Sequence, residues 1–131
     1  MSLTRLEEWE DKLQDIFDRI DVHLEEKYDD LYPLHPARPD EGETSNPRHD
    51  GLFDVHAAFS AGFGSVHGEG YVLCVRMVTL SRVPKDVREK IEQEVVDLLE
   101  EDLPQAFPGK NLRVERDGNV YKIIGDLSLF D

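Results

Sequence analysis

Histidine and carboxylate side chains gather between residues 49 and 69, where their types and spacing could support metal chemistry. The set comprises His49, Asp50, Asp54, His56, His67 and Glu69. Imidazole and carboxylate groups are the usual protein ligands of zinc, manganese and non-haem iron. Asp54 and His56 are two apart on a predicted strand, so their side chains leave the same face. His67 and Glu69 repeat that spacing further along, which gives a candidate metal site of Asp54, His56, His67 and Glu69.

A structural role for these residues competes with metal binding. The sequence has no His-Glu-x-x-His motif or similar signature. In a tight hairpin, His56 would lie about 20 Å from the turn, at about 3.3 Å per residue. His56 would then be a surface residue paired with Asp54 or Arg76. We therefore predict no cofactor, and keep a divalent metal as the alternative.

Two other segments contain residue types that enzymes use, and both fit a structural role better. Residues 62–70 are rich in glycine, but a strand follows them and they contain no lysine, unlike phosphate-binding loops. Cys74 is the only cysteine, and its apolar neighbours favour a core thiol over a nucleophile. No catalytic residue can be assigned from these patterns.

The charge of the chain limits its partners. Fifteen Lys and Arg stand against 29 Asp and Glu, a formal net charge of −14. Nucleic acids and anionic membrane surfaces repel such a chain. We find neither a secretory signal at the N-terminus nor an apolar run of about 18 residues. We therefore expect a cytoplasmic protein that binds neither nucleic acid nor membrane.

The first 31 residues predict one long helix. An apolar stripe recurs every three or four positions, at Leu6, Trp9, Leu13, Ile16 and Ile20. Nothing breaks the helix before Pro33, so about 28 residues would span about 42 Å at 1.5 Å per residue. A globule of this size has a radius of gyration of about 14 Å. The stripe is therefore a candidate interface with a second chain, and the alternative is that it covers the sheet of its own chain.

The rest of the chain predicts two hairpins separated by a second helix. Residues 33–50 contain four prolines, which predict a mobile loop. Strands are expected at 53–61 and 71–80 from alternating apolar residues. A helix is expected from Pro84 to Leu103, and a second hairpin joins 112–116 to 120–124 through Asp-Gly. We predict a single α+β domain over residues 1–131, with an antiparallel sheet packed by helices.

Two functions remain open at this stage. The first is a non-catalytic interaction module, either a homodimer or a subunit that binds another protein. It rests on the long first helix and the lack of a catalytic signature. The alternative is a small metal-dependent enzyme or ligand-binding domain that uses the His, Asp and Glu residues around the first hairpin.

Overall fold

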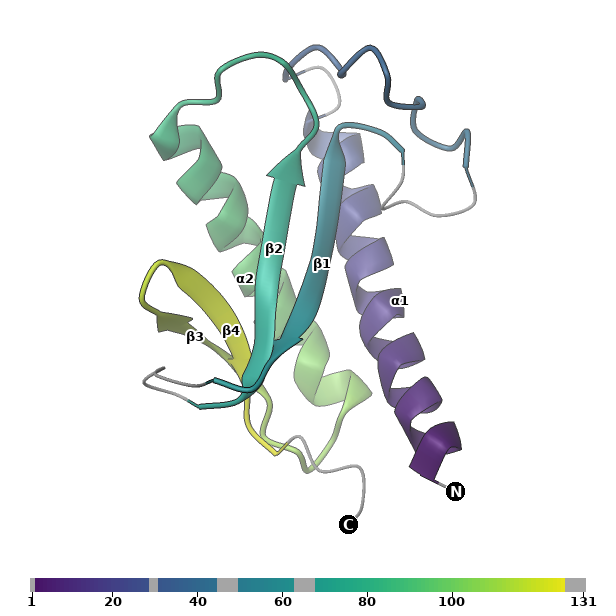
Figure 1. Ribbon diagram of the computed structural model, residues 1–131, viewed down its shortest axis with the longest axis vertical. Coiled ribbons are helices and arrows are strands. Elements are labelled where there is room, and N and C mark those ends of the chain that lie inside the picture. The colour runs from purple at the N-terminus through teal and green to yellow at the C-terminus, as the bar shows by residue number, and fades with distance from the viewer. Residues whose placement is uncertain (1, 29–30, 45–49, 63–67, 127–131) are drawn as a thin grey trace.

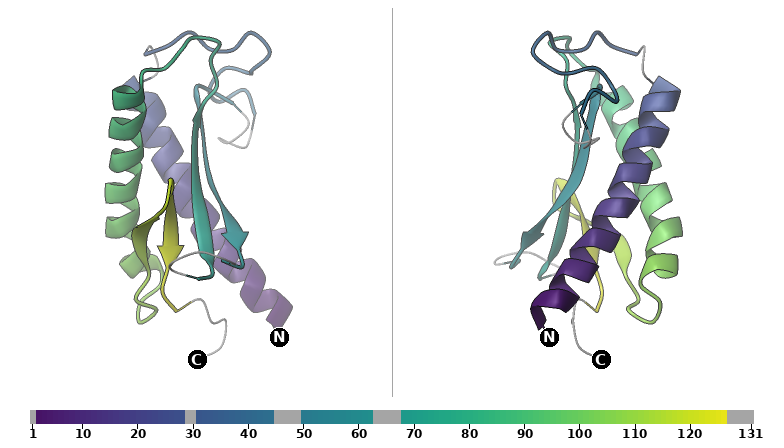
Figure 2. Two further views of the ribbon diagram at one scale, coloured as in Figure 1. Left: turned by 60° about the vertical axis from the view of Figure 1, so that its left-hand side comes forward. Right: turned by 90° about the vertical axis from the view of Figure 1, so that its right-hand side faces the viewer.

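A computed structural model describes residues 2–28, 31–44, 50–62 and 68–126, with side chains from residue 7 onward. The element order is helix α1 (Ser2–Tyr28), strands β1 (Phe53–Ser60) and β2 (Gly70–Met77), helix α2 (Lys85–Ala106), and strands β3 (Arg113–Asp117) and β4 (Val120–Ile124). The strands form one sheet, in the order β1-β2-β4-β3, and every pair is antiparallel. The α+β prediction is therefore confirmed. Both helices lie on one side of the sheet (Figures 1 and 2).

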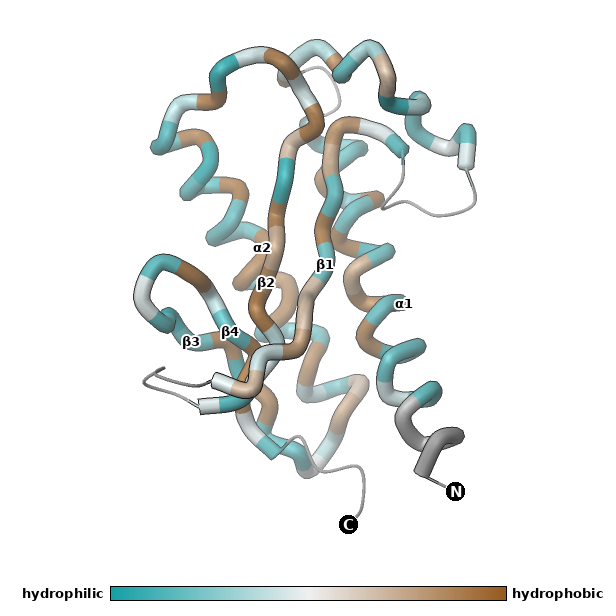
Figure 3. The backbone as a smooth tube through the Cα atoms, in the orientation of Figure 1, coloured by the Kyte–Doolittle hydropathy of each residue, from teal (hydrophilic) through white to brown (hydrophobic). Residues whose placement is uncertain are grey.

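The register of the first hairpin follows from its alternating pattern. Phe53 lies opposite Met77, and Val55 lies opposite Val75. Phe53 and Val55 are buried toward the helices, with 0% and 1% of their surfaces exposed. A slip of one residue would move these side chains to the other face, so their burial fixes the register. Apolar residues recur along both strands (Figure 3).

Helix α2 continues further than the sequence predicts. The expected end was Leu103, because proline removes a backbone donor, but the helix includes Pro104 and ends at Ala106. Pro104 stands in the last turn and removes a single helical hydrogen bond, the one that an N–H at this position would donate to the Glu100 carbonyl. The N–H of Phe107 donates to the carbonyl of Leu103 at 2.9 Å, and both side chains are buried. Packing at the helix end thus offsets the proline.

Strand β4 meets β2 over a short distance only. Among the described residues, the two strands pair at Tyr71–Ile123 and Val72–Lys122. Gly70 lies at this junction, and a Cβ there would come within 2.7 Å of the Ile123 carbonyl oxygen. A glycine therefore permits the close approach of β4. Beyond the junction, the β3–β4 hairpin diverges from β2 (Figures 1 and 2).

Candidate functional site

The predicted interface stripe on α1 lies in the core of its own chain. Trp9, Leu13, Ile16 and Ile20 are between 0% and 7% exposed. The indole N–H of Trp9 donates to the Tyr71 hydroxyl at 3.2 Å, and the Trp9 and Phe107 rings are 4.3 Å apart. These contacts leave the four side chains little surface for a second chain. The side chain of Leu6 lies outside the described residues.

The predicted metal ligands are brought together only in part. Asp54 Oδ1 is 3.0 Å from His56 Nδ1, and Asp54 Oδ2 accepts a hydrogen bond from Arg76 at 3.4 Å. This is the structural alternative considered for His56. Glu69 precedes the Gly70–Ser60 pair, four residues along β1 from His56, or about 13 Å. Across residues 2–28, 31–44, 50–62 and 68–126, no three His, Cys, Asp or Glu side chains are grouped to hold a metal. His49 and His67 lie outside these ranges, so the four-residue site stays a prediction.

Among the described residues, the edge of β2 that faces β4 has no strand partner beyond Val72. The N–H of Val78 donates to the carbonyl of Leu52 at 2.7 Å. Because hydrogen-bonded pairs alternate in an antiparallel ladder, Arg76 and Cys74 also direct their backbone groups toward β1. Val75 and Met77 then direct theirs to the opposite edge, where β4 has already diverged. Within the described chain, Val75 therefore has no strand partner on that side.

Two cavities follow this open edge, and both include Val75 and Arg76 in their walls. We call them together the strand-edge groove. The upper cavity, of about 350 Å³, is lined by Val75, Arg76, Met77, Thr79, Ser81, Arg82, Val83, Arg88 and Ile91. The lower cavity, of about 600 Å³, is lined by Asp54, His56, Leu73, Cys74, Val75, Arg76, Glu92, Asn119, Val120 and Tyr121. The groove thus has β2 on one side, and α2 with the β3–β4 turn on the other.

Two exposed apolar side chains lie beside the groove. Leu80 is 75% exposed and stands between the upper lining residues Thr79 and Ser81. Val120 is 39% exposed and lines the lower cavity. Exposed apolar surface around a depression marks interaction sites more often than plain surface does. The groove therefore offers a backbone edge flanked by apolar contacts.

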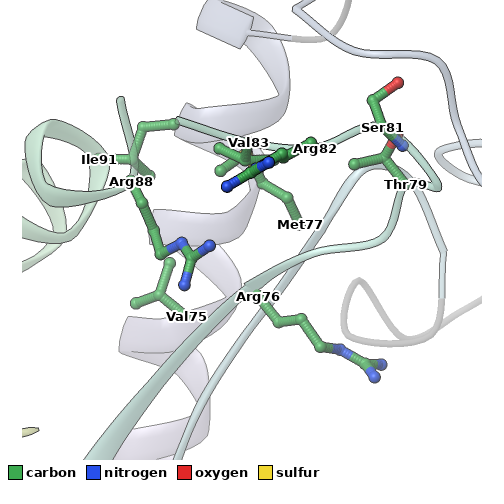
Figure 4. Close-up of a pocket in the computed structure, with 9 residues that line it drawn as sticks. All are labelled: Val75, Arg76, Met77, Thr79, Ser81, Arg82, Val83, Arg88 and Ile91. Atoms are coloured by element: carbon green, nitrogen blue, oxygen red, sulfur yellow. The ribbon is translucent and has the colours of Figure 1, made fainter. Parts of the chain in front are cut away.

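The two ends of the groove differ in charge. Three arginines and no acidic residue line the upper cavity, in a chain whose net charge is −14. Figure 4 shows Arg82 and Arg88 extending toward the same space, whereas Arg76 points away from it, toward its partner Asp54. The lower cavity carries Asp54 and Glu92. Among the described residues, the groove is therefore most positive at the α2 N-terminal end, and its acidic side chains lie at the other end beside the shared Arg76.

A second unusual feature is a set of buried carboxyl groups where α1 meets β1. Asp21, Glu25 and Asp50 are each 2% exposed. Burial, with the nearby charges of Glu25 and Asp50, raises the pKa of Asp21 to about 8. Burial also raises the pKa of Glu25 to about 7. The hydrogen bond that Glu25 accepts from the Phe53 N–H at 2.8 Å acts in the opposite direction and lowers this pKa. Asp21 Oδ2 has no hydrogen-bond partner among the described residues.

The described part of the proline-rich segment is tied to these carboxyl groups. Arg38 donates to the carbonyls of Asp50, Gly51 and Phe53 at 3.0–3.2 Å. The Thr44 hydroxyl donates to Asp50 Oδ2 at 2.7 Å. These bonds hold residues 38–44 against the start of β1. Residues 45–49 lie outside the described chain, so the mobile loop stays a prediction.

The strand-edge groove could not be predicted from the sequence. The strand pattern of residues 71–80 is visible in the sequence, but the departure of β4 from β2 is not. Arg82 and Arg88 are six apart across a helix start, which no motif marks. The burial of Asp21 and Glu25 was also missed, although each directly follows a buried apolar residue of α1, Ile20 and Leu24 respectively.

The described residues include no helix long and apolar enough to cross a membrane. A family model described as "Uncharacterised protein" matches residues 4–125. A protein of Borreliella burgdorferi described as "Uncharacterized protein" is 38% identical over 125 residues, which cover 95% of this chain and 98% of that relative. No solved structure matches the chain. The matched range includes every residue of the strand-edge groove, and the chain belongs to this uncharacterised protein family.

Proposed function

We propose that this protein is a non-catalytic binding module that takes an extended segment of another protein into the strand-edge groove. The observation that carries the proposal is the open edge of β2, which pairs with β1 along eight residues and with β4 along two. An extended segment that adds to such an edge gains backbone hydrogen bonds, and side-chain pockets provide selectivity. From Leu73 to Met77 the edge accommodates about five residues, or about 16 Å, although the Met77 carbonyl already accepts a hydrogen bond from the Thr79 N–H at 3.2 Å.

The shape of the groove favours a single segment over the sheet of a second copy. Residues of α2 and of the β3–β4 turn stand opposite β2 across the cavities. A partner must therefore enter between two walls, which a single strand does more readily than a sheet edge. Two copies that each carry a net charge of −14 also repel each other.

Peptides selected for binding provide the test. A phage-displayed library of random nine-residue peptides is selected on the immobilised protein, and the tightest-binding peptide is synthesised. Each backbone nitrogen of that peptide is then methylated in turn. Strand addition predicts loss of affinity at every second position only, because alternate N–H groups point away from β2. Peptide binding should also slow amide exchange at Val75 and Met77.

A matched pair of variants locates the binding surface. Val120→Asp places a charge in the lower cavity and should weaken peptide binding by about tenfold or more. Val22→Asp introduces the same change on α1, at a side chain that is 41% exposed, and should leave binding unchanged. Failure to select any peptide would overturn the proposal. So would methylation effects without a two-residue period, or a mass of twice 15.1 kDa that peptide does not reduce.

A further inference from the structure

The upper end of the strand-edge groove carries two arginines, and the described residues provide neither with an ion-pair partner. Neither Arg82 nor Arg88 makes an ion pair or side-chain hydrogen bond with any described residue. Arg76 is different, because Asp54 accepts a hydrogen bond from its guanidinium at 3.4 Å. Arg82 and Arg88 are both exposed to solvent, and they line one cavity in a chain with 29 acidic residues.

The surroundings of these arginines suit an anionic group. Thr79 and Ser81 also line this cavity. The Thr79 hydroxyl oxygen accepts a hydrogen bond from the Ser81 N–H at 3.1 Å, and the Ser81 side chain extends away from both arginines (Figure 4). The acidic residue nearest in sequence to Arg88 is Glu89, which pairs with Lys85 at 3.7 Å. Glu92 lines the lower cavity instead. Helix α2 begins at Lys85 without a side-chain cap, and the partial positive charge of its N-terminus adds to the same potential, whereas Asp86 in the first turn opposes it.

We infer that Arg82 and Arg88 bind the carboxylate of an Asp or Glu side chain in the segment that occupies the strand-edge groove. The inference rests on the proposed function, because the carboxylate is supplied by the added strand. Guanidinium groups recognise carboxylates through paired, charge-assisted hydrogen bonds. The contact fixes which end of the segment lies at α2, since the opposite end of the groove carries Asp54 and Glu92.

The inference predicts which residues the selected peptides contain. They should carry Asp or Glu toward one end, and replacing that residue by Gln should weaken binding by about tenfold or more. Arg82→Gln/Arg88→Gln should weaken binding of the acidic peptide by a similar factor. These two proteins and two peptides form a double-mutant cycle. The double variant and the unmodified protein should bind the Gln peptide equally well, because that peptide has no carboxylate for the arginines to bind.

A second double variant separates the local contact from overall charge. Arg19→Gln/Arg113→Gln makes the same change in net charge at two exposed side chains away from the groove. It should leave the affinity for the acidic peptide within about twofold at moderate salt, where distant charges are screened. Equal losses for the two double variants would overturn the inference.

A phosphate group could satisfy the same two arginines, so one arm of the experiment tests it. The acidic residue of the selected peptide is replaced by phosphoserine. Affinity within a few-fold of the acidic peptide supports the carboxylate, and a gain of more than about tenfold overturns it in favour of a phosphorylated segment. The N-methylated peptides could show strand addition while the effects of the arginine and carboxylate replacements are merely additive. In that case the inference fails and the proposed function stands. If no peptide binds, both fail.

Discussion

Asp21 couples the stability of the protein to pH in an uncommon direction. Its carboxyl group keeps a proton in the folded chain up to a pKa of about 8, against 3.8 for the unperturbed group. Between these values the folded chain binds more protons than the unfolded chain, so the free energy of unfolding falls as pH rises. Glu25 acts in the same direction up to about pH 7. The groups that face the pair are Arg38, Glu41 and Asp50 from the proline-rich segment and Asp54 from β1.

Replacing Asp21 by Asn should remove much of this dependence, because the amide stays neutral at every pH. We expect Asp21→Asn to be more stable than the unmodified protein at pH 8.5, and equally or less stable at pH 5. Each group contributes a slope of at most about 1.4 kcal/mol per pH unit. Urea unfolding at the two pH values measures the effect.

The exposed Asp15 on the same helix provides the control. Asp15→Asn should shift stability by less than about 0.5 kcal/mol at both pH values. If the unmodified protein became more stable between pH 5 and 8, burial of a neutral Asp21 would be refuted.

Single residues were predicted with unequal success. The pairing of Asp54 with His56 and with Arg76 follows from their positions, because neighbouring positions on one face of a strand pair fix which side chains can meet. The buried acids were not predicted, since hydrophobic patterning assigns charged residues to the surface. Their burial depends on a contact between α1 and the start of β1, far apart in sequence. Gly51 is part of this contact, because any Cβ there would clash with the Glu25 carboxylate.

Helix α1 contributes to stability through the same stripe that its length had suggested for a partner. Leu13→Ala should lower the free energy of unfolding by about 2–5 kcal/mol, because Leu13 is 6% exposed and its removal leaves a cavity. Val22→Ala, on the exposed side of α1, should cost less than about 0.5 kcal/mol. Chemical denaturation of both variants checks the prediction. Equal effects would show that the two faces of α1 are packed alike.

Most helices and strands could be predicted from the sequence, but the order of the strands in the sheet could not. Periodicity fixes helices and strands because each must bury one face. The order β1-β2-β4-β3 depends on which edges meet, and the local patterns of residues 71–80 and 120–124 are compatible with several orders. The open edge of β2, and with it the groove, therefore could not be foreseen.

Across the whole molecule, solubility and stability should respond to acid in opposite ways. The net charge vanishes near the isoelectric point of 4.6, where repulsion between molecules is lost. At that pH, Asp21 and Glu25 keep their protons in the folded chain, and pH 4.6 lies only just above their unperturbed pKa values of 3.8 and 4.5, so their destabilising effect is much smaller than at neutral pH. We expect a solubility minimum between about pH 4 and 5 in which the precipitate consists of folded protein.

Turbidity during titration measures this minimum, and circular dichroism of the redissolved protein measures whether the chain stayed folded. Constant turbidity through the interval would contradict the charge argument. A precipitate that redissolves unfolded would contradict the stability argument instead.

The short junction between β2 and β4 divides the sheet into two hairpins, and this division has a kinetic consequence. The β3–β4 ladder is local in sequence, whereas the Tyr71–Ile123 pair joins residues 52 positions apart. Local ladders close with a smaller loss of chain entropy, so the hairpins should form before they join. Gly70→Ala disturbs the junction selectively, since its Cβ would meet the Ile123 carbonyl oxygen. In stopped-flow experiments, this variant should unfold faster and refold at an almost unchanged rate, with a φ-value near zero.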